Sequence, residues 1–452
     1  MAGPTAPPGE NRGTPDLMSL LRSRSYLTIL VVAALIGAPV ALVSYWFLQL
    51  STHLQDWIFV DLPKVMGLGP PTWWPAPVLV IGGLLVALTI RYLPGRGGES
   101  PADGFRAGGG APEPIELLGI SLAALVTLSS GAVLGPEAPL IAIGGGLGAW
   151  AVQLLKRDAP SQAVALIGVA GSFAAISTLL GSPLLAAFLL MEIAGLGGAM
   201  TSLMLVPGLL AAGIGSLVFV GLDSLTGLGT TSLAIPDLPP VRDPTIAEFG
   251  WAVVIGVAAA VLGTGIRRLG QSLRPGVERR LLLATPAMGL LVAGLAILYS
   301  EVTGKSSSDV LFSGQEALPS LVTESAGYSV GALLLLVLCK GLAYGICLSS
   351  FRGGPVFPAM FVGAAGGIAM AHLPGLQTVS GAAMGIGAMC VVMLGFPLVS
   401  VLLATLLLMS DGLSVTPLVI VAVVVAYVGR AWLGRVVQSP VEPESSSSAA
   451  VS

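Results

Sequence analysis

The sequence predicts an all-α integral membrane protein built from two inverted helical halves, whose broken helices meet near the midplane of the bilayer. Of its 452 residues, 54% are hydrophobic and 10% are charged, whereas soluble domains carry about 25% charged residues. Uncharged stretches such as Tyr26–Leu50 and Ala159–Met191 exceed the roughly 20 residues with which a helix crosses a hydrocarbon core. A sequence pattern that occurs once in each half is the third observation.

The same composition argues against several other classes of protein. Segments of alternating hydrophobicity, typical of barrel strands, are absent, so the spans are expected to be helices. The net charge of −3 gives no basis for a nucleic-acid partner. Because the sequence contains no metal-ligand, nucleotide or nucleophile motif, we expect neither an enzyme nor a bound metal or cofactor. The three cysteines lie in apolar segments and are expected to be buried thiols.

The repeat consists of two pairs of matching segments. Ser129–Gly148 and Ser349–Gly367 each contain a serine pair, a G-P-x-x-P motif, an apolar step and a glycine cluster. Each is followed by a similar apolar segment, Gly168–Gly195 in the first half and Gly385–Gly412 in the second. These segments begin 29 and 27 residues after the second proline of the motif (168 minus 139; 385 minus 358). Two matches in the same order indicate a duplicated half.

Charged residues give the expected orientation of the halves. The linker 222–248 carries four acidic residues against Arg242 alone, which indicates the outside, whereas the five arginines of segment 267–280 indicate the inside. Arginines also precede the first span, so the first half crosses an odd number of times and the second half is inverted. The expected divisions are a cytoplasmic segment 1–25, a first membrane half 26–221, an extracellular linker 222–248, a second membrane half 249–435 and a short disordered tail 436–452.

A G-P-x-x-P motif at membrane depth predicts the start of a helix. Gly and Pro stop the preceding helix, and the second Pro fits the first turn of the next one, where its missing N–H is not needed. The N-terminus of a helix carries roughly half a positive charge and several free N–H groups. Two inverted copies aim two such ends at one point, which favours an anion without requiring Lys or Arg.

Glu137 stands in the first turn of the first of these predicted helices, within the sequence GPEAP. Its carboxylate can occupy the anion site itself, compete with the permeant ion and leave when it is protonated. We therefore interpret Glu137 as the gate, because ionisable residues at membrane depth are usually functional. The alternative interpretation is a plain cap of the helix in a water-lined vestibule.

The repeated motifs resemble those of the CLC family of chloride channels and transporters. GAVLGPEAPLIAIGGGLG is similar to the family segment that ends in G-[KR]-E-G-P, and GGPVFPAM is similar to the G-x-F-x-P segment. The similarity covers Tyr26–Arg435 and implies a bacterial member without C-terminal CBS domains, located in the cell membrane. It further implies a homodimer in the lipid bilayer, with chloride as the transported ligand. The implied anion-binding positions are Gly135, Pro136, Glu137, Ala138, Gly354, Val356, Phe357 and Gly98.

Several residues depart from the family pattern. The basic residue before the gating glutamate is Pro136 here, and the anion-binding Ser of the family's G-S-G-x-P motif falls on Gly98. Pro355 has no N–H to donate, although Val356 and Phe357 retain theirs. The family's anion-coordinating Tyr has no evident match, because Tyr427 comes too early. These departures predict an inner end of the pathway that is wider or less selective than in typical members.

The mode of transport depends on a second acidic residue. Glu192 aligns with the first of two acidic residues that many proton-coupled members carry, and the second falls on Ile193. We therefore expect passive transport of chloride or a similar small anion, with anion/proton exchange as the alternative. A fluoride exporter is less expected, because that branch typically has Thr where Pro139 stands. Glu192 is either a possible internal acidic site or, as we favour, a structural residue at a helix end.

Two further expectations concern the surface of the subunit. The segments 182–192 and 396–410 match the interface helices of the family, and we expect Ala187 and Leu403 to lie where a tryptophan would separate the subunits. The sequence indicates no acidic partner for Lys340, so its long side chain is expected to extend to a membrane–water interface.

Overall fold

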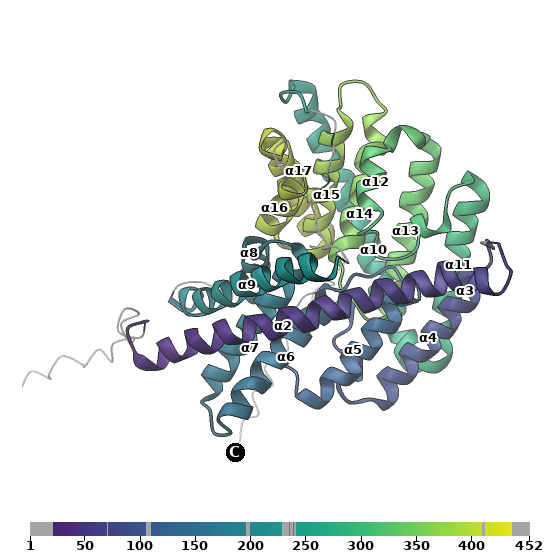
Figure 1. The fold of residues 1–452 in the computed structure, drawn as a ribbon. Helices are drawn as coiled ribbons and strands as arrows, with labels where there is room; N and C mark the ends of the chain where they lie inside the picture. Colours follow the sequence, from purple (N-terminus) through teal and green to yellow (C-terminus); the bar gives the residue numbers. More distant parts are fainter. Residues whose placement is uncertain are drawn as a thin grey trace, which may run out of the picture.

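The computed structural model of the chain describes residues 21–435 except 70, 105–109, 196–198, 228–234, 236–237, 239–240 and 409–411. Within these ranges the chain is helical and contains no β-strand (Figure 1). The predicted tail 436–452 and residues 1–20 of the predicted N-terminal segment lie outside the described residues.

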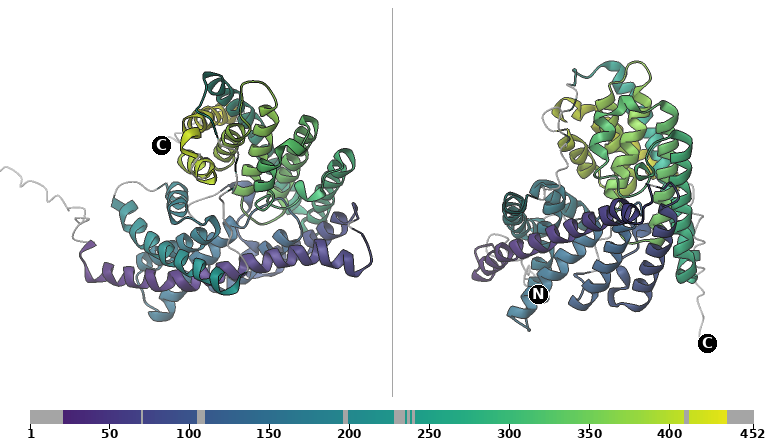
Figure 2. Two further views of the ribbon diagram at one scale, coloured as in Figure 1. Left: turned by 45° about the horizontal axis from the view of Figure 1, so that its top comes forward. Right: turned by 45° about the vertical axis from the view of Figure 1, so that its right-hand side comes forward.

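The first half contains helices α2 to α9, with short irregular turns between them. Their bounds are α2 Arg24–Asp56, η1 Trp57–Asp61, α3 Leu62–Val65, α4 Pro75–Tyr92, η2 Pro94–Gly97, η3 Pro101–Asp103, α5 Pro114–Ser129, α6 Glu137–Leu155, α7 Ser161–Leu180, α8 Pro183–Ala194 and α9 Ala199–Thr226. Figures 1 and 2 show α2 as a long helix that runs along one side of this half.

The second half contains helices α10 to α17. Their bounds are α10 Ile246–Arg279, α11 Leu281–Thr303, η4 Ser307–Asp309, α12 Leu318–Thr323, η5 Ser325–Gly327, α13 Val330–Ser350, α14 Val356–Ala371, α15 Thr378–Leu394, α16 Pro397–Leu407 and α17 Gly412–Arg435. The expected linker 222–248 is shorter than predicted, because α9 continues to Thr226 and α10 already begins at Ile246. A capping box between Thr245 and Glu248 sets that beginning.

Membrane insertion follows from the length and apolarity of these helices. Nine helices among the described residues are long and apolar enough to cross a bilayer, so the protein is a multi-pass integral membrane protein. Five further apolar helices, α5, α8, α14, α15 and α16, have only 10–17 residues. A helix of that length does not cross about 30 Å of hydrocarbon. Short apolar helices of this kind agree with the helix breaks that the repeated motifs predict.

The two halves repeat the same close packing of glycine-lined helices. Gly144 in α6 and Gly363 in α14 each lie seven residues after the start of their helix. Each touches the backbone of a glycine in the next helix, Gly171 and Gly385, so closely that an added Cβ would overlap it. Small residues of this kind let membrane helices approach each other.

This packing also corrects the register of the predicted repeat. The sequence comparison placed Gly168 opposite Gly385, but the structural counterpart of Gly385 is Gly171, three residues later. The ends of α7 and α15 support this pairing. Gly181 and Gly395, which end the two helices in the left-handed backbone conformation, each lie ten residues after the glycine at the helix contact. With this register, the packing glycine lies 32 residues after the second proline of the motif in the first half and 27 residues after it in the second (171 minus 139; 385 minus 358).

Candidate anion site

The starts of α6 and α14 form the two sides of the candidate site. Pro136 and Pro355 occupy the N-cap positions, and Glu137 and Val356 are the first helical residues. Neither helix has a side-chain hydrogen bond at its N-cap, since proline carries no oxygen with which to cap. The N–H groups of the first turns are therefore free of a local cap. Both helix starts were predicted from the G-P-x-x-P motifs.

The two helix starts are joined through the backbone immediately before them. Gly135 and Gly354 form an isolated antiparallel bridge. The N–H of Gly135 donates to the carbonyl of Gly354 over 2.8 Å, and the N–H of Gly354 donates back over 2.6 Å. The repeats, which are 219 residues apart at this point (354 minus 135), thus meet at equivalent glycines.

The side chain of Glu137 crosses from the first half to the second. It is fully buried, with 0% exposure, and its Oε1 accepts a hydrogen bond of 2.9 Å from the backbone N–H of Phe357. Its Oε2 is buried and has no hydrogen-bond partner in the described part of the chain. A Cβ added to Gly354 would overlap this oxygen, so the carboxylate fills the space that the glycine leaves. The carboxylate therefore lies at the N-terminus of α14, where the sequence places an anion.

Most predicted site residues come together here. Gly135, Gly354 and Phe357 contact one another or Glu137 as described, and Pro136, Ala138 and Val356 belong to the same two helix starts. Gly98 stands apart from these contacts, in the turn between η2 and η3 with φ +84°, and the nearest side chain to its Cβ position is that of Ile120. Without a side chain, Gly98 offers no hydroxyl to an anion.

Two residues near the site were not predicted from the sequence. The fully buried Tyr344 of α13 donates its hydroxyl proton to the carbonyl of Pro355 over 2.6 Å, which fixes the start of α14. Arg352 lies directly before the two glycines that lead into α14. It borders the segment 353–410, in which no Asp, Glu, Lys or Arg occurs. A single charged residue next to so long an uncharged segment was the signal in the sequence that could have identified it.

Tyr427, the tyrosine that comes too early to match the family's anion ligand, lines a cavity of about 490 Å³ together with Arg267 and Arg430.

Glu192 lies at the end of α8, and its carboxylate contacts the start of α16. Oε1 accepts from the N–H of Leu398 over 3.0 Å, and Oε2 accepts from the N–H of Val399 over 2.8 Å. These are free N–H groups of a helix that begins at Pro397 without a side-chain cap of its own. Glu192 therefore caps a helix of the other half, as the structural interpretation expects.

Lys340 does not reach a membrane interface, and that expectation was wrong. The side chain is 0% exposed. Its ammonium donates hydrogen bonds of 2.9 to 3.3 Å to four consecutive backbone carbonyls, those of residues 309–312. The aromatic ring of Phe361 lies 4.4 Å from Nζ. The partners of this lysine are carbonyls of a distant loop, which a sequence pattern does not reveal.

Ala187 and Leu403 do not lie on the surface of the subunit, so the expectation that they mark a subunit interface was wrong. Ala187 in α8 and Leu403 in α16 are 4% and 1% exposed within a single subunit, so a tryptophan at either position would disrupt its interior. Leu184 and Leu406 on the same helices are 62% and 44% exposed. The predicted segments therefore present apolar side chains outward, but through another face of each helix.

The fold and this junction define a polytopic helical membrane protein of two inverted halves, with a carboxylate from one half seated at a helix start of the other. A family model described as voltage gated chloride channel matches residues 82–430. The chain belongs to this family, the CLC family that its motifs resemble, and it is accordingly an ion-transport protein.

Similar proteins and solved structures agree with this assignment. "Putative ion-transport protein YfeO" of Escherichia coli O17:K52:H18 is 28% identical over 377 residues, which cover 81% of this chain and 85% of the relative. The protein of the same name from Salmonella paratyphi A is 29% identical over 374 residues, 81% of this chain and 86% of the relative.

Two solved structures share the fold at 19% sequence identity. A slow cyanobacterial Cl⁻/H⁺ antiporter has a TM-score of 0.73, with 90% of this chain and 95% of that chain covered. A CLC-type fluoride/proton antiporter has a TM-score of 0.67, with 91% and 97% covered.

Proposed function

We propose that the chain transports a small inorganic anion, with chloride as the first candidate, along a pathway that the carboxylate of Glu137 gates. The observation that carries this proposal is the position of that carboxylate. It is buried at the N-terminus of α14 and accepts the N–H of Phe357. An N–H group at a helix start binds chloride for the same reason that it binds a carboxylate.

The gate operates through competition for one place. While Glu137 is ionised, its carboxylate holds the N–H of Phe357 and excludes a second negative charge. Protonation removes the charge and weakens the hydrogen bond, because charge-assisted hydrogen bonds are the stronger ones. The neutral side chain then leaves and the anion takes the N–H groups. Oε2, which has no partner in this position, is the oxygen that is free to take the proton.

Exchange of the anion for protons is the mode that the comparisons support better than passive flow. Both of the antiporters with this fold exchange protons for chloride or fluoride, according to their descriptions. A gate that opens by protonation takes up one proton at each opening, which supplies the outer half of such a cycle. Chloride ranks above fluoride because Pro139 stands where fluoride exporters of the family typically have Thr.

Passive flow remains the second candidate, because a specific observation favours it. An exchanger needs an inner acidic residue that passes protons to the gate. Glu192 already accepts two backbone N–H groups of α16, and its neighbour Ile193 does not titrate. The capping role of Glu192 argues against a free proton carrier at this place.

The experiment imposes a chloride gradient on proteoliposomes, clamps the membrane potential with an ionophore and follows the external pH. Exchange predicts uphill proton movement driven by chloride, which Glu137→Ala abolishes. Chloride flux without proton movement supports passive flow instead, and the absence of any anion flux contradicts the proposed function.

Because the family resemblance implies a homodimer, we propose that each of two subunits contains its own pathway in the lipid bilayer.

A further inference from the structure

Arg352 occupies the turn between α13 and α14, two residues before Gly354. Its backbone N–H donates to Oγ1 of Thr127 in α5 over 3.3 Å, so the other half of the protein holds its main chain in place. The neighbouring main chain is fixed by the bridge between Gly135 and Gly354. The position of Arg352 relative to the gate is therefore set by the meeting of the two repeats.

The guanidinium of Arg352 lacks a partner of opposite charge. Its Nη1 donates only to the carbonyl of the preceding residue, Phe351, over 3.2 Å. Its Nε is buried and has no hydrogen-bond partner in the described part of the chain. No carboxylate among the described residues lies within ion-pair distance of it.

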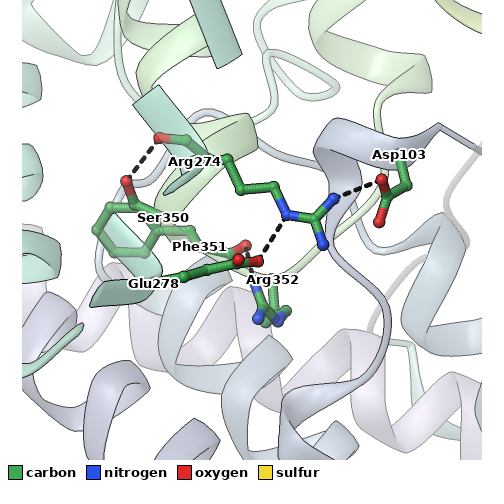
Figure 3. Close-up of polar contacts among 7 residues, drawn as sticks. Asp103, Arg274, Glu278, Ser350, Phe351 and Arg352 are labelled. Atoms are coloured by element: carbon green, nitrogen blue, oxygen red, sulfur yellow. Dashed lines mark hydrogen bonds and ion pairs between the residues drawn. The ribbon is translucent and has the colours of Figure 1, made fainter. Parts of the chain in front are cut away.

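The acidic residues nearby are engaged by another arginine. Arg274 of α10 donates to Glu278 over 2.6 Å and also forms an ion pair with Asp103. Figure 3 shows Arg274 bridging these two carboxylates, with the side chain of Arg352 beside them and joined by a dashed line only to Phe351. The carboxylates of Asp103 and Glu278 thus contact Arg274 and not Arg352.

A charged group in such a place is costly without a counter-ion. The side chain of Arg352 is only partly exposed, and withdrawing a cation from water is unfavourable unless it is paired and hydrogen-bonded. An arginine keeps its charge at neutral pH, so loss of a proton does not relieve the cost. The unpaired, buried Nε therefore indicates an anion that is not part of the chain.

The surroundings of Arg352 place it on the inner side of the gate. Gly354, two residues on, lies against the Glu137 carboxylate. In the other direction, a Cβ on Gly97 would lie 3.2 Å from Cγ of Arg352, so the arginine passes beside the Gly97–Gly98 turn. The adjacent Arg274 belongs to the arginine-rich segment 267–280 that the charge pattern places inside.

We propose that Arg352 coordinates the transported anion on the cytoplasmic side of Glu137. Its guanidinium supplies the positive charge and N–H donors that the bare backbone of Gly98 and the missing N–H of Pro355 do not. The ligand is a small monovalent anion, which fits one guanidinium and the N–H groups of a helix start. This inference rests on the proposed function, since it assigns a residue to the same pathway.

Chloride binding measured by isothermal titration calorimetry tests the assignment, with purified protein in detergent. Glu137→Gln serves as the background, because it removes the competing carboxylate. Adding R352Q is expected to weaken chloride binding by about tenfold or more, as the loss of a charge-assisted hydrogen bond implies. R352K keeps the positive charge but lacks the planar guanidinium. Its chloride affinity is expected to lie between those of the Glu137→Gln background and of the same background with R352Q. R279Q, which removes an exposed arginine of segment 267–280, is expected to leave chloride affinity unchanged.

A chemical modification tests the location without relying on the stability of R352Q. The native thiols Cys339, Cys347 and Cys390 are buried, so a cysteine introduced by R352C reports on its own site. A cationic methanethiosulfonate reagent added from the inner side is expected to modify R352C more slowly as chloride rises. It is also expected to restore chloride affinity, whereas an anionic reagent of similar size is not.

The outcomes separate this assignment from the proposed function. Unchanged chloride affinity in R352Q, or a modification rate of R352C that chloride does not alter, overturns the role of Arg352. If the parent protein moves no anion in proteoliposomes, the proposed function itself fails. Anion flux in the parent together with an R352Q variant of equal chloride affinity overturns only the assignment of Arg352.

Discussion

The main chains of Gly135 and Gly354 exchange two hydrogen bonds, with N–O distances of 2.8 and 2.6 Å. This bridge joins equivalent positions of the two repeats immediately before α6 and α14. Because it fixes both helix starts, it also fixes how far the Glu137 side chain must reach to meet Phe357. The gate is therefore a property of the junction between the halves.

Gly354→Ala is expected to displace the Glu137 carboxylate. An added Cβ would overlap Oε2, and the bridge leaves the backbone little freedom to move. Anion flux at neutral pH should increase several-fold, because the competing charge no longer occupies the site. Gly366→Ala in α14 is the matched control, since no described atom outside its own helix backbone lies within 4 Å of its Cβ position. Equal flux at neutral pH in Gly354→Ala and the parent contradicts this role.

Glu192→Ala should lower the stability of the protein by removing the cap of α16. Loss of an N-terminal cap typically costs about 0.5–2 kcal/mol, and two N–H groups lose their acceptor here. Thermal unfolding in detergent measures the effect, with Glu192→Gln as the conservative variant that retains an acceptor oxygen. If Glu192→Gln keeps its stability but loses chloride-driven proton movement, a proton role replaces the structural one.

Lys340→Met should destabilise the loop between α11 and α12. The ammonium satisfies four carbonyls of residues 309–312, and the loop continues to Phe312, whose N–H donates to the carbonyl of Gly131. We expect a loss on the order of 3 kcal/mol, because buried carbonyls lose their donor. Lys64→Met, at a side chain that is 69% exposed, should stay within about 0.5 kcal/mol. A similar melting temperature for both variants argues against the role of Lys340.

Leu184→Trp and Leu406→Trp are expected to shift a homodimer toward monomers. Both side chains project from the helices that the family resemblance assigns to the interface, and they are 62% and 44% exposed in one subunit. Leu291→Trp is the control, because this residue is 53% exposed on α11, which lies on another side of the subunit (Figure 1). Single-molecule photobleaching in bilayers gives the subunit count. A parent that bleaches in single steps contradicts the homodimer.

The core of the site was predictable because its signals are local. Each G-P-x-x-P motif marks the start of a helix, at Glu137 and at Val356, and the repeat brings the two motifs together. Glu137 follows from its motif alone, and Gly135, Gly354 and Phe357 follow from the resemblance of the two motifs to those of the family. The same resemblance places Gly98 where the family has a serine hydroxyl.

The remaining contacts were not predictable, because they join segments far apart in the chain. Glu192 caps a helix that begins more than 200 residues later, at a hydrogen-bond separation of 206 and 207 residues. The unpaired state of Arg352 depends on Arg274 having taken the nearby carboxylates. Ala187 lies on the expected helix, but sequence spacing alone does not say which face of a uniformly apolar helix points inward.

The gate itself is tested most directly by the pH dependence of chloride efflux from proteoliposomes containing the parent, Glu137→Gln or Glu137→Ala. Parent efflux should rise as the pH falls from neutral to acidic, because protonation releases the carboxylate from the N–H of Phe357. Both variants should transport rapidly and lose this pH dependence, and Glu324→Gln, which neutralises an exposed acid, should behave like the parent. Efflux from both Glu137 variants that matches the parent at acidic and at neutral pH would contradict the account.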